Sequence, residues 1–129
     1  MNEPVNSTVR RAGNEVEHVD GVVSVNLGDV PLAGPAGVVW GLDSSQLNAN
    51  LVTLGPGEAI GDHVNDEVDQ LLVVQVGAGV VVVDGVEYPV ETETLLLIPS
   101  GCSREIRADR LMTYLSIHVR RDRLSPKDR

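Results

Sequence analysis

The chain has 129 residues, a formal net charge of −9, one Trp, two Tyr and no Phe. The length suits a single domain, and the negative charge with so few aromatic side chains argues against nucleic acid as a partner. No apolar run is long enough to cross a bilayer and residues 1–9 do not resemble a secretory signal, so no membrane partner is expected. The single cysteine cannot form an internal disulfide and is typical of a reducing compartment, which predicts a cytoplasmic protein.

Residues 1–20 are polar without a regular period and are predicted to form a loose arm. Short β-rich runs follow, separated by Gly and Pro, over residues 22–27, 38–42, 50–54, 71–76, 80–83, 86–88, 94–98 and 111–120. Asp84-Gly85 between two of these runs is typical of a two-residue hairpin, because both residue types accept positive φ. Val and Ile together outnumber Leu, and no long helical period occurs. The pattern predicts an antiparallel all-β barrel or sandwich over residues 21–120 and a basic tail over 121–129.

The last predicted strand separates two faces. Leu111, Thr113, Leu115, Ile117 and Val119 fall on one face, and Met112, Tyr114, Ser116 and His118 fall on the other. The polar side chains of Tyr114, Ser116 and His118 are candidates to line a cavity. For His118, an exposed position at a strand edge is the alternative. Other runs, such as 80–83, are apolar at every position and need cover on both faces, which favours a homodimer.

Basic residues are unevenly placed along the chain. No Lys or Arg occurs between Ala12 and Ser103, so Arg104 is the first cation after a long acidic stretch. A buried guanidinium needs an anionic partner. That partner is either internal, from Glu67 or Asp69, or the anionic group of a bound small molecule.

Two motifs resemble those of small single-domain cupins. The first runs from Gly57 through His63, Asn65 and Gln70 to Gly77, and the second is Pro99-Ser100-Gly101-Cys102-Ser103-Arg104. The resemblance covers residues 51–119. It implies a jelly-roll, double-stranded β-helix barrel, a homodimer and a ligand site at the mouth of the barrel.

The resemblance places His63, Asn65, Gln70 and Arg104 at the four positions that hold metal in cupins. Only His63 is the usual residue type there. Asn and Gln offer a carbonyl oxygen at best, and Arg has no lone pair to donate. No cofactor is therefore expected, beyond a weakly held divalent metal. In a second register, one uninterrupted strand would bring His63, Glu67 and Asp69 to the same face as an alternative metal-binding set.

The function predicted from these residues is the binding of a small, anionic molecule in the barrel without a tightly held metal. His63, Asn65, Gln70, Arg104, Tyr114 and His118 are the candidate ligand-binding residues. One alternative is a cupin enzyme, metal-dependent or metal-free, of isomerase, epimerase or oxygenase type, with His63 as its catalytic residue. Another is a structural or interaction module whose barrel is filled.

Overall fold

The computed structural model describes residues 6–11, 15–31, 36–64 and 68–120. The described residues form strands β1 (Asn6–Arg11), β2 (Glu15–Asp20), β3 (Gly37–Asp43), β4 (Leu47–Leu54), β5 (Ala59–Val64), β6 (Gln70–Val76), β7 (Ala78–Val83), β8 (Val86–Glu91), β9 (Leu95–Ile98), β10 (Ser103–Ala108) and β11 (Met112–Val119), with one 3-10 turn, η2 (Leu27–Asp29). No helix in the described ranges is long and apolar enough to cross a membrane.

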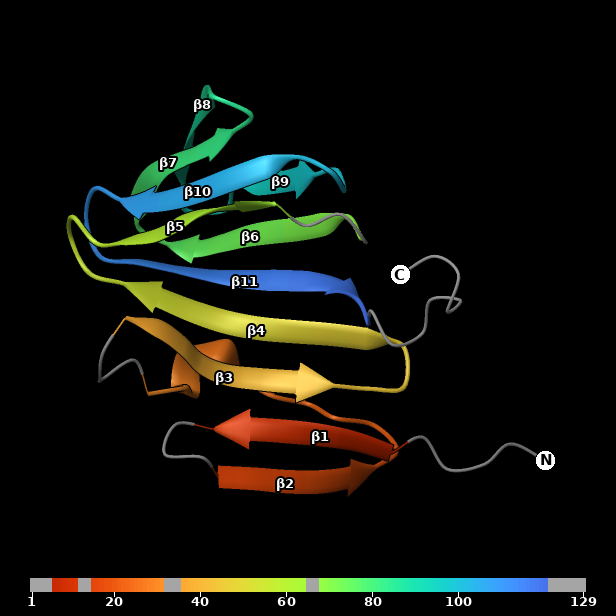
Figure 1. Ribbon diagram of the computed structural model, residues 1–129. Helices are drawn as coiled ribbons and strands as arrows, with labels where there is room; N and C mark the ends of the chain where they lie inside the picture. The colour runs from red at the N-terminus through yellow and green to blue at the C-terminus, as the bar shows by residue number, and fades with distance from the viewer. Residues whose placement is uncertain (1–5, 12–14, 32–35, 65–67, 121–129) are drawn as a thin grey trace.

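The strands form two antiparallel sheets (Figure 1). One has seven strands in the order β2-β1-β3-β4-β11-β6-β9, and the other has four in the order β5-β10-β7-β8. The smaller sheet faces one end of the larger sheet, and β2, β1 and β3 extend the larger sheet beyond the barrel (Figure 1). This is the predicted jelly-roll barrel.

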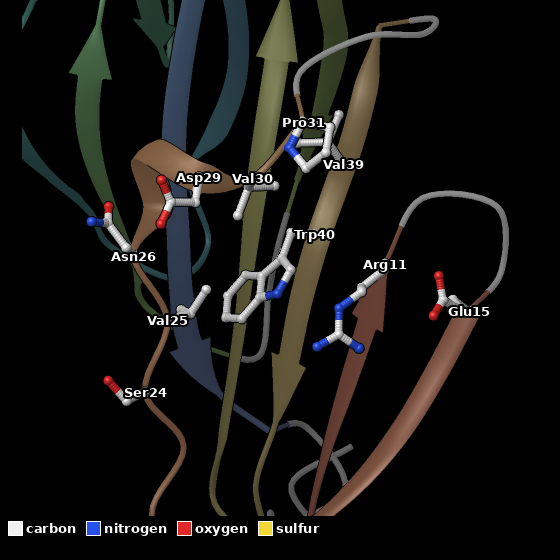
Figure 2. A pocket seen from close by; sticks show the side chains of 10 residues that line it. All are labelled: Arg11, Glu15, Ser24, Val25, Asn26, Asp29, Val30, Pro31, Val39 and Trp40. Atoms are coloured by element: carbon white, nitrogen blue, oxygen red, sulfur yellow. The ribbon is translucent and has the colours of Figure 1, made fainter.

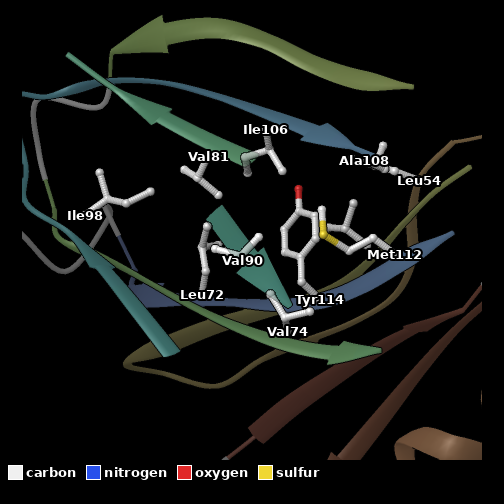
Figure 3. Close-up of a cluster of buried hydrophobic side chains, with 11 residues drawn as sticks. Leu54, Leu72, Val74, Val81, Val90, Ile98, Ile106, Ala108, Met112 and Tyr114 are labelled. Atoms are coloured by element: carbon white, nitrogen blue, oxygen red, sulfur yellow. The ribbon is translucent and has the colours of Figure 1, made fainter. Parts of the chain in front are cut away.

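The barrel core consists of inward side chains from both sheets (Figure 3). Leu54 of β4, Met112 of β11, Val81 of β7 and Ile106 of β10 are each at most 1% exposed. Burying a side chain of this size contributes about 1.5–3 kcal/mol relative to leaving it in water. The predicted alternation along β11 is confirmed, because Met112 and Tyr114 face this core.

The predicted Asp84-Gly85 hairpin is also confirmed. The two residues have φ of 49° and 81°, and they join β7 to β8. The Asp84 carboxylate accepts hydrogen bonds from the backbone amide of Ser103, at 2.8 Å, and from its hydroxyl, at 3.2 Å. The hairpin is therefore fixed to the start of β10.

The prediction of a loose arm is wrong for residues 6–11 and 15–20. These residues form the β1–β2 hairpin, which pairs with the edge of β3. The reason is that the buried face of β1 contains a single apolar residue: Val9 is 3% exposed, and Ser7 on the same face is 5% exposed, so the sequence shows no apolar alternation. The expected boundaries at residues 20 and 120 stay predictions, and residues 121–129 lie outside the described ranges.

The predicted strand at residues 22–27 is wrong as well. This segment is irregular up to η2, and Val22 is 93% exposed. Val23, Leu27 and Val30 pack instead on a second apolar cluster, which we call the outer cluster. Its buried members are Val9, Val39, Trp40 and Leu51. The segment thus covers the outer face of the larger sheet.

Candidate ligand-binding site

A pair of buried polar side chains lies between β6 and β11. Gln70 is 5% exposed and Ser116 is 6% exposed. The Gln70 amide donates from Nε2 to Ser116 Oγ at 2.5 Å. Gln70 Oε1 is buried, and within the described part of the chain it has no hydrogen-bond partner. Leaving a buried acceptor unsatisfied costs about 1–3 kcal/mol. The hydroxyls of Thr53 and Thr113 are likewise buried without a partner in the described ranges, but a hydroxyl can rotate to a partner whereas the Gln70 amide is fixed by Ser116.

Arg104 and Tyr114 are the other predicted ligand-binding residues that the structure brings to the barrel interior. Arg104 lies on the same face of β10 as the buried Ile106, and its Nε is buried. Tyr114 is 3% exposed, and burial raises the pKa of its phenol while the positive charge of Arg104 opposes that rise. The phenol therefore stays protonated near neutral pH and can donate a hydrogen bond.

The other predicted residues are placed only in part. The backbone of His63 lies in β5 opposite Arg104, which keeps these two positions next to each other. Asn65 and Glu67 lie outside the described residues. His118 is partly exposed, and its Nδ1 is 2.9 Å from the carbonyl oxygen of Val119. Asp69 is exposed and accepts a hydrogen bond from the Ser100 backbone amide at 2.9 Å.

The two described side chains at the cupin ligand positions, Gln70 and Arg104, do not suit a metal ion. Gln70 offers one carbonyl oxygen, and Arg104 carries a permanent positive charge and has no lone pair to donate. Within the described ranges, no three His, Cys, Asp or Glu side chains gather closely enough to hold a metal. The alternative set of His63, Glu67 and Asp69 involves side chains outside these ranges and stays a prediction.

Cys102 packs at the edge of the barrel core next to Asp84. Hydrogen bonds from the Ser103 backbone amide and from the Cys102 thiol hold the pKa of Asp84 below its usual value. In return, the hydrogen bond to Asp84, together with burial, raises the pKa of the Cys102 thiol. A thiol that resists deprotonation is a poor nucleophile, so the surroundings of Cys102 do not favour a nucleophilic role.

Ser116 is a site residue that the sequence indicated only through its alternation with Tyr114 and His118. Its pairing with Gln70 joins two strands that are 46 residues apart in the chain. No local pattern predicts such a contact, because it depends on the register between β6 and β11.

A cavity of about 410 Å³ lies outside the barrel, beside Trp40 (Figure 2). It is bordered by β1, β3 and the segment before η2, and Arg11, Glu15 and Asp29 contribute charged side chains. Arg11 is already ion-paired to Glu17 at 2.8 Å. This cavity has no buried polar atom comparable to Gln70 Oε1 among the described residues, so we place the candidate site in the barrel.

Fold and site together define a small antiparallel β-barrel protein with buried polar side chains at one end of the barrel. The family model for the cupin domain matches residues 50–118, and the chain belongs to this family. The match begins within β4, so β1, β2 and β3 precede the matched region.

Solved structures support the fold. The cupin domain of Cnp3 from Schizosaccharomyces pombe is 14% identical, with a TM-score of 0.67 over 92% of this chain and 88% of that one. A sugar phosphate isomerase of the cupin superfamily from Silicibacter pomeroyi is 31% identical, with a TM-score of 0.54 over 59% of this chain and 52% of that one. A Bacillus halodurans protein is 27% identical, with a TM-score of 0.54 over 57% of this chain, and the match spans only 62% of that protein. A comparison with curated proteins gave no match.

Proposed function

We propose that this cupin binds a small carboxylate-bearing molecule at the polar end of its barrel, without a tightly held metal. The observation that carries the proposal is the pair formed by Gln70 and Ser116, which leaves Gln70 Oε1 buried without a partner in the described part of the chain. An acceptor of this kind lowers the stability of the protein without ligand, and it strengthens binding when a donor group of the ligand forms a hydrogen bond to it.

The charge and the donors at this end of the barrel favour an anion. Arg104 supplies a permanent positive charge, and a guanidinium matches the planar geometry of a carboxylate. The buried Tyr114 hydroxyl supplies a neutral donor within the field of Arg104. A hydroxyl or protonated oxygen of the ligand then donates to Gln70 Oε1. A similar protein from Silicibacter pomeroyi is named a sugar phosphate isomerase, and a sugar phosphate is an anion.

The test is a thermal-shift titration of the purified protein with sodium acetate, sodium hexanoate and sodium gluconate, against sodium chloride at equal ionic strength. We expect carboxylates to raise the unfolding midpoint of the wild type. Arg104→Ala should lose this response. Arg107→Ala is the matched control, because Arg107 lies on the outer face of the same strand in an exposed ion pair with Glu87 at 3.1 Å.

Two outcomes contradict the proposal. The first is a wild-type midpoint that no carboxylate moves. The second is an Arg104→Ala variant that keeps the full response to carboxylates, which would mean that Arg104 does not hold the ligand. Elemental analysis of the same preparation tests the metal expectation, since about one tightly bound metal per chain would favour a metal-dependent enzyme instead.

We also propose that the protein is cytoplasmic and forms a homodimer. The two copies associate through the outer face of β6 and β9. Leu95 and Leu97 are 63% and 57% exposed and lie opposite Val73 and Leu71. These four apolar side chains form one patch, and an apolar patch is complementary to a second copy of itself, as a two-fold interface requires. Light scattering should give a dimer that Leu97→Lys converts to a monomer, whereas Val22→Lys, at a 93% exposed position, should leave it intact. A monomeric wild type would refute this association.

A further inference from the structure

The inner face of the larger sheet continues beyond the barrel as a polar surface. Strand register places Arg10 opposite Gly41, Gly41 opposite Asn50, and Asn50 opposite Ser116. The next row on the same face runs from Thr8 through Asp43 and Asn48 to His118. Neighbouring strands lie about 4.8 Å apart, so these rows connect β1 with the Gln70–Ser116 pair without a break.

Four of these side chains form a closed ring of hydrogen bonds, which we call the polar ring. Arg10 Nε donates to Asp43 Oδ2 at 2.9 Å, and Arg10 Nη2 donates to Asn50 Oδ1 at 3.0 Å. Asn50 Nδ2 donates to Asn48 Oδ1 at 2.7 Å, and Asn48 Nδ2 donates to Asp43 Oδ1 at 2.5 Å. Each member is thus held by two others, and the ring fixes the direction of every amide and of the guanidinium.

Gly41 is the reason that the ring can close. A methyl group at this position would overlap the guanidinium of Arg10, which lies directly over the glycine. The ring is accessible to solvent, since the side chains of Arg10 and Asp43 are 34% and 26% exposed. It is therefore a preorganised surface next to the barrel rather than part of the core.

The N–H groups that are not used within the polar ring determine which ligand groups it can bind. Arg has five N–H donors and each Asn amide has two. The ring uses two donors of Arg10 and one each of Asn48 and Asn50. Within the described residues the remaining donors, on Arg10 and on both amides, bond to no other side chain. The acceptor oxygens of both amides and both oxygens of Asp43 already receive a hydrogen bond. The surface is thus rich in donors, while the Arg10–Asp43 pair leaves its formal charge at zero.

We infer that the polar ring is a second subsite for the same ligand, and that this ligand is a polyhydroxylated carboxylic acid. The inference rests on the proposed function, because Arg104 is to hold the carboxylate. Directed donors without net charge suit hydroxyl and ether oxygens, whereas an alkyl chain would leave them unpaired and lose affinity. Asn50 is the cross-strand neighbour of Ser116, so a ligand that enters the barrel end continues over the ring.

Gluconate and hexanoate distinguish this inference from the binding of any carboxylate, because both have six carbons and only gluconate carries hydroxyl groups on its chain. Isothermal titration of the full chain should give tighter binding of gluconate than of hexanoate. In Asn50→Ala the affinity for gluconate should fall about three- to tenfold, the value of one or two hydrogen bonds, while that for hexanoate changes less than twofold. Asn48→Ser provides a second, smaller perturbation of the ring, and Arg107→Ala is the control outside it.

The outcomes separate this inference from the proposed function. The inference is wrong if both acids bind the wild type equally. It is also wrong if Asn50→Ala and Asn48→Ser lower only the unfolding midpoint and leave the ratio of gluconate affinity to hexanoate affinity unchanged, because the ring would then serve only stability. If neither acid binds the wild type, the proposed function fails and the inference fails with it. A ratio that falls toward one in the ring variants, with hexanoate binding retained, supports the inference.

Discussion

Replacing Gln70 and Ser116, singly and together, tests whether this pair is retained for binding rather than for stability. Ser116→Ala leaves Gln70 Nε2 buried and unpaired, which should destabilise the protein by about 1–3 kcal/mol. Gln70→Met has a similar length and removes both amide atoms, including the buried Oε1. In the double variant no buried polar side-chain atom of the pair remains. Since the wild type already bears the cost of Oε1, the double variant should be more stable than the wild type by about 1–2 kcal/mol.

Urea denaturation followed by far-ultraviolet circular dichroism measures the difference. For a domain of this size the slope is about 1–3 kcal/mol per molar urea, so the midpoint should rise by several tenths of a molar or more. The double variant should also lose its response to carboxylates. A double variant that is less stable than the wild type by 1 kcal/mol or more would refute the reasoning, since it would mean that Gln70 Oε1 is satisfied in the empty protein, for example by a bound water.

Three further variants test the hairpin, the thiol and the buried phenol. Gly85→Val should destabilise the protein by about 1–3 kcal/mol through strain at a φ of 81°, and Gly85→Asn should destabilise it less because Asn tolerates positive φ. Equal urea midpoints for the two variants would contradict the positive φ of Gly85 in the hairpin. Because the pKa of Asp84 is lowered in the folded state, the stabilisation by its carboxylate is present above the ordinary pKa of 3.8 and is lost as pH falls below that value, and Asp84→Asn should flatten this acid dependence. The same substitution should speed alkylation of the Cys102 thiol by iodoacetamide at neutral pH, and an unchanged rate would contradict the hydrogen bond between the two side chains. Because the pKa of Tyr114 is raised in the folded state, the free energy of unfolding should fall as pH rises above about 10, and it should fall less in Tyr114→Phe. Identical pH profiles of the two proteins would argue against a buried phenol.

The sequence predicted the barrel well where periodicity and turn chemistry act locally. Asp84-Gly85 identified its hairpin, because positive φ is a property of these two residues alone. The alternation from Met112 to Ser116 identified the inner face of β11, because Met112, Tyr114 and Ser116 are buried there. Strand β10 was not predicted, since Arg104 and Arg107 interrupt its apolar pattern although the strand is paired on both edges.

The sequence identified residues of the candidate site but not the contacts between them. The cupin motifs identified Gln70 and Arg104, and the structure places both at the barrel, but the partner of Gln70 depends on the register of β6 against β11. The polar ring was missed for a similar reason. Arg10 and Asn50 are 40 residues apart, and the sequence gives no sign that Gly41 lies between them.

Trp40 has a consequence for how the protein is observed in solution. It is the only tryptophan of the chain, and it belongs to the outer cluster rather than to the barrel core. Its fluorescence therefore reports whether the β1–β2 hairpin and the segment before η2 are docked, and circular dichroism reports the strands of both sheets. If the hairpin detaches before the barrel opens, the two signals will show different transitions, and a two-state analysis based on fluorescence alone would assign the stability of the outer layer to the whole domain.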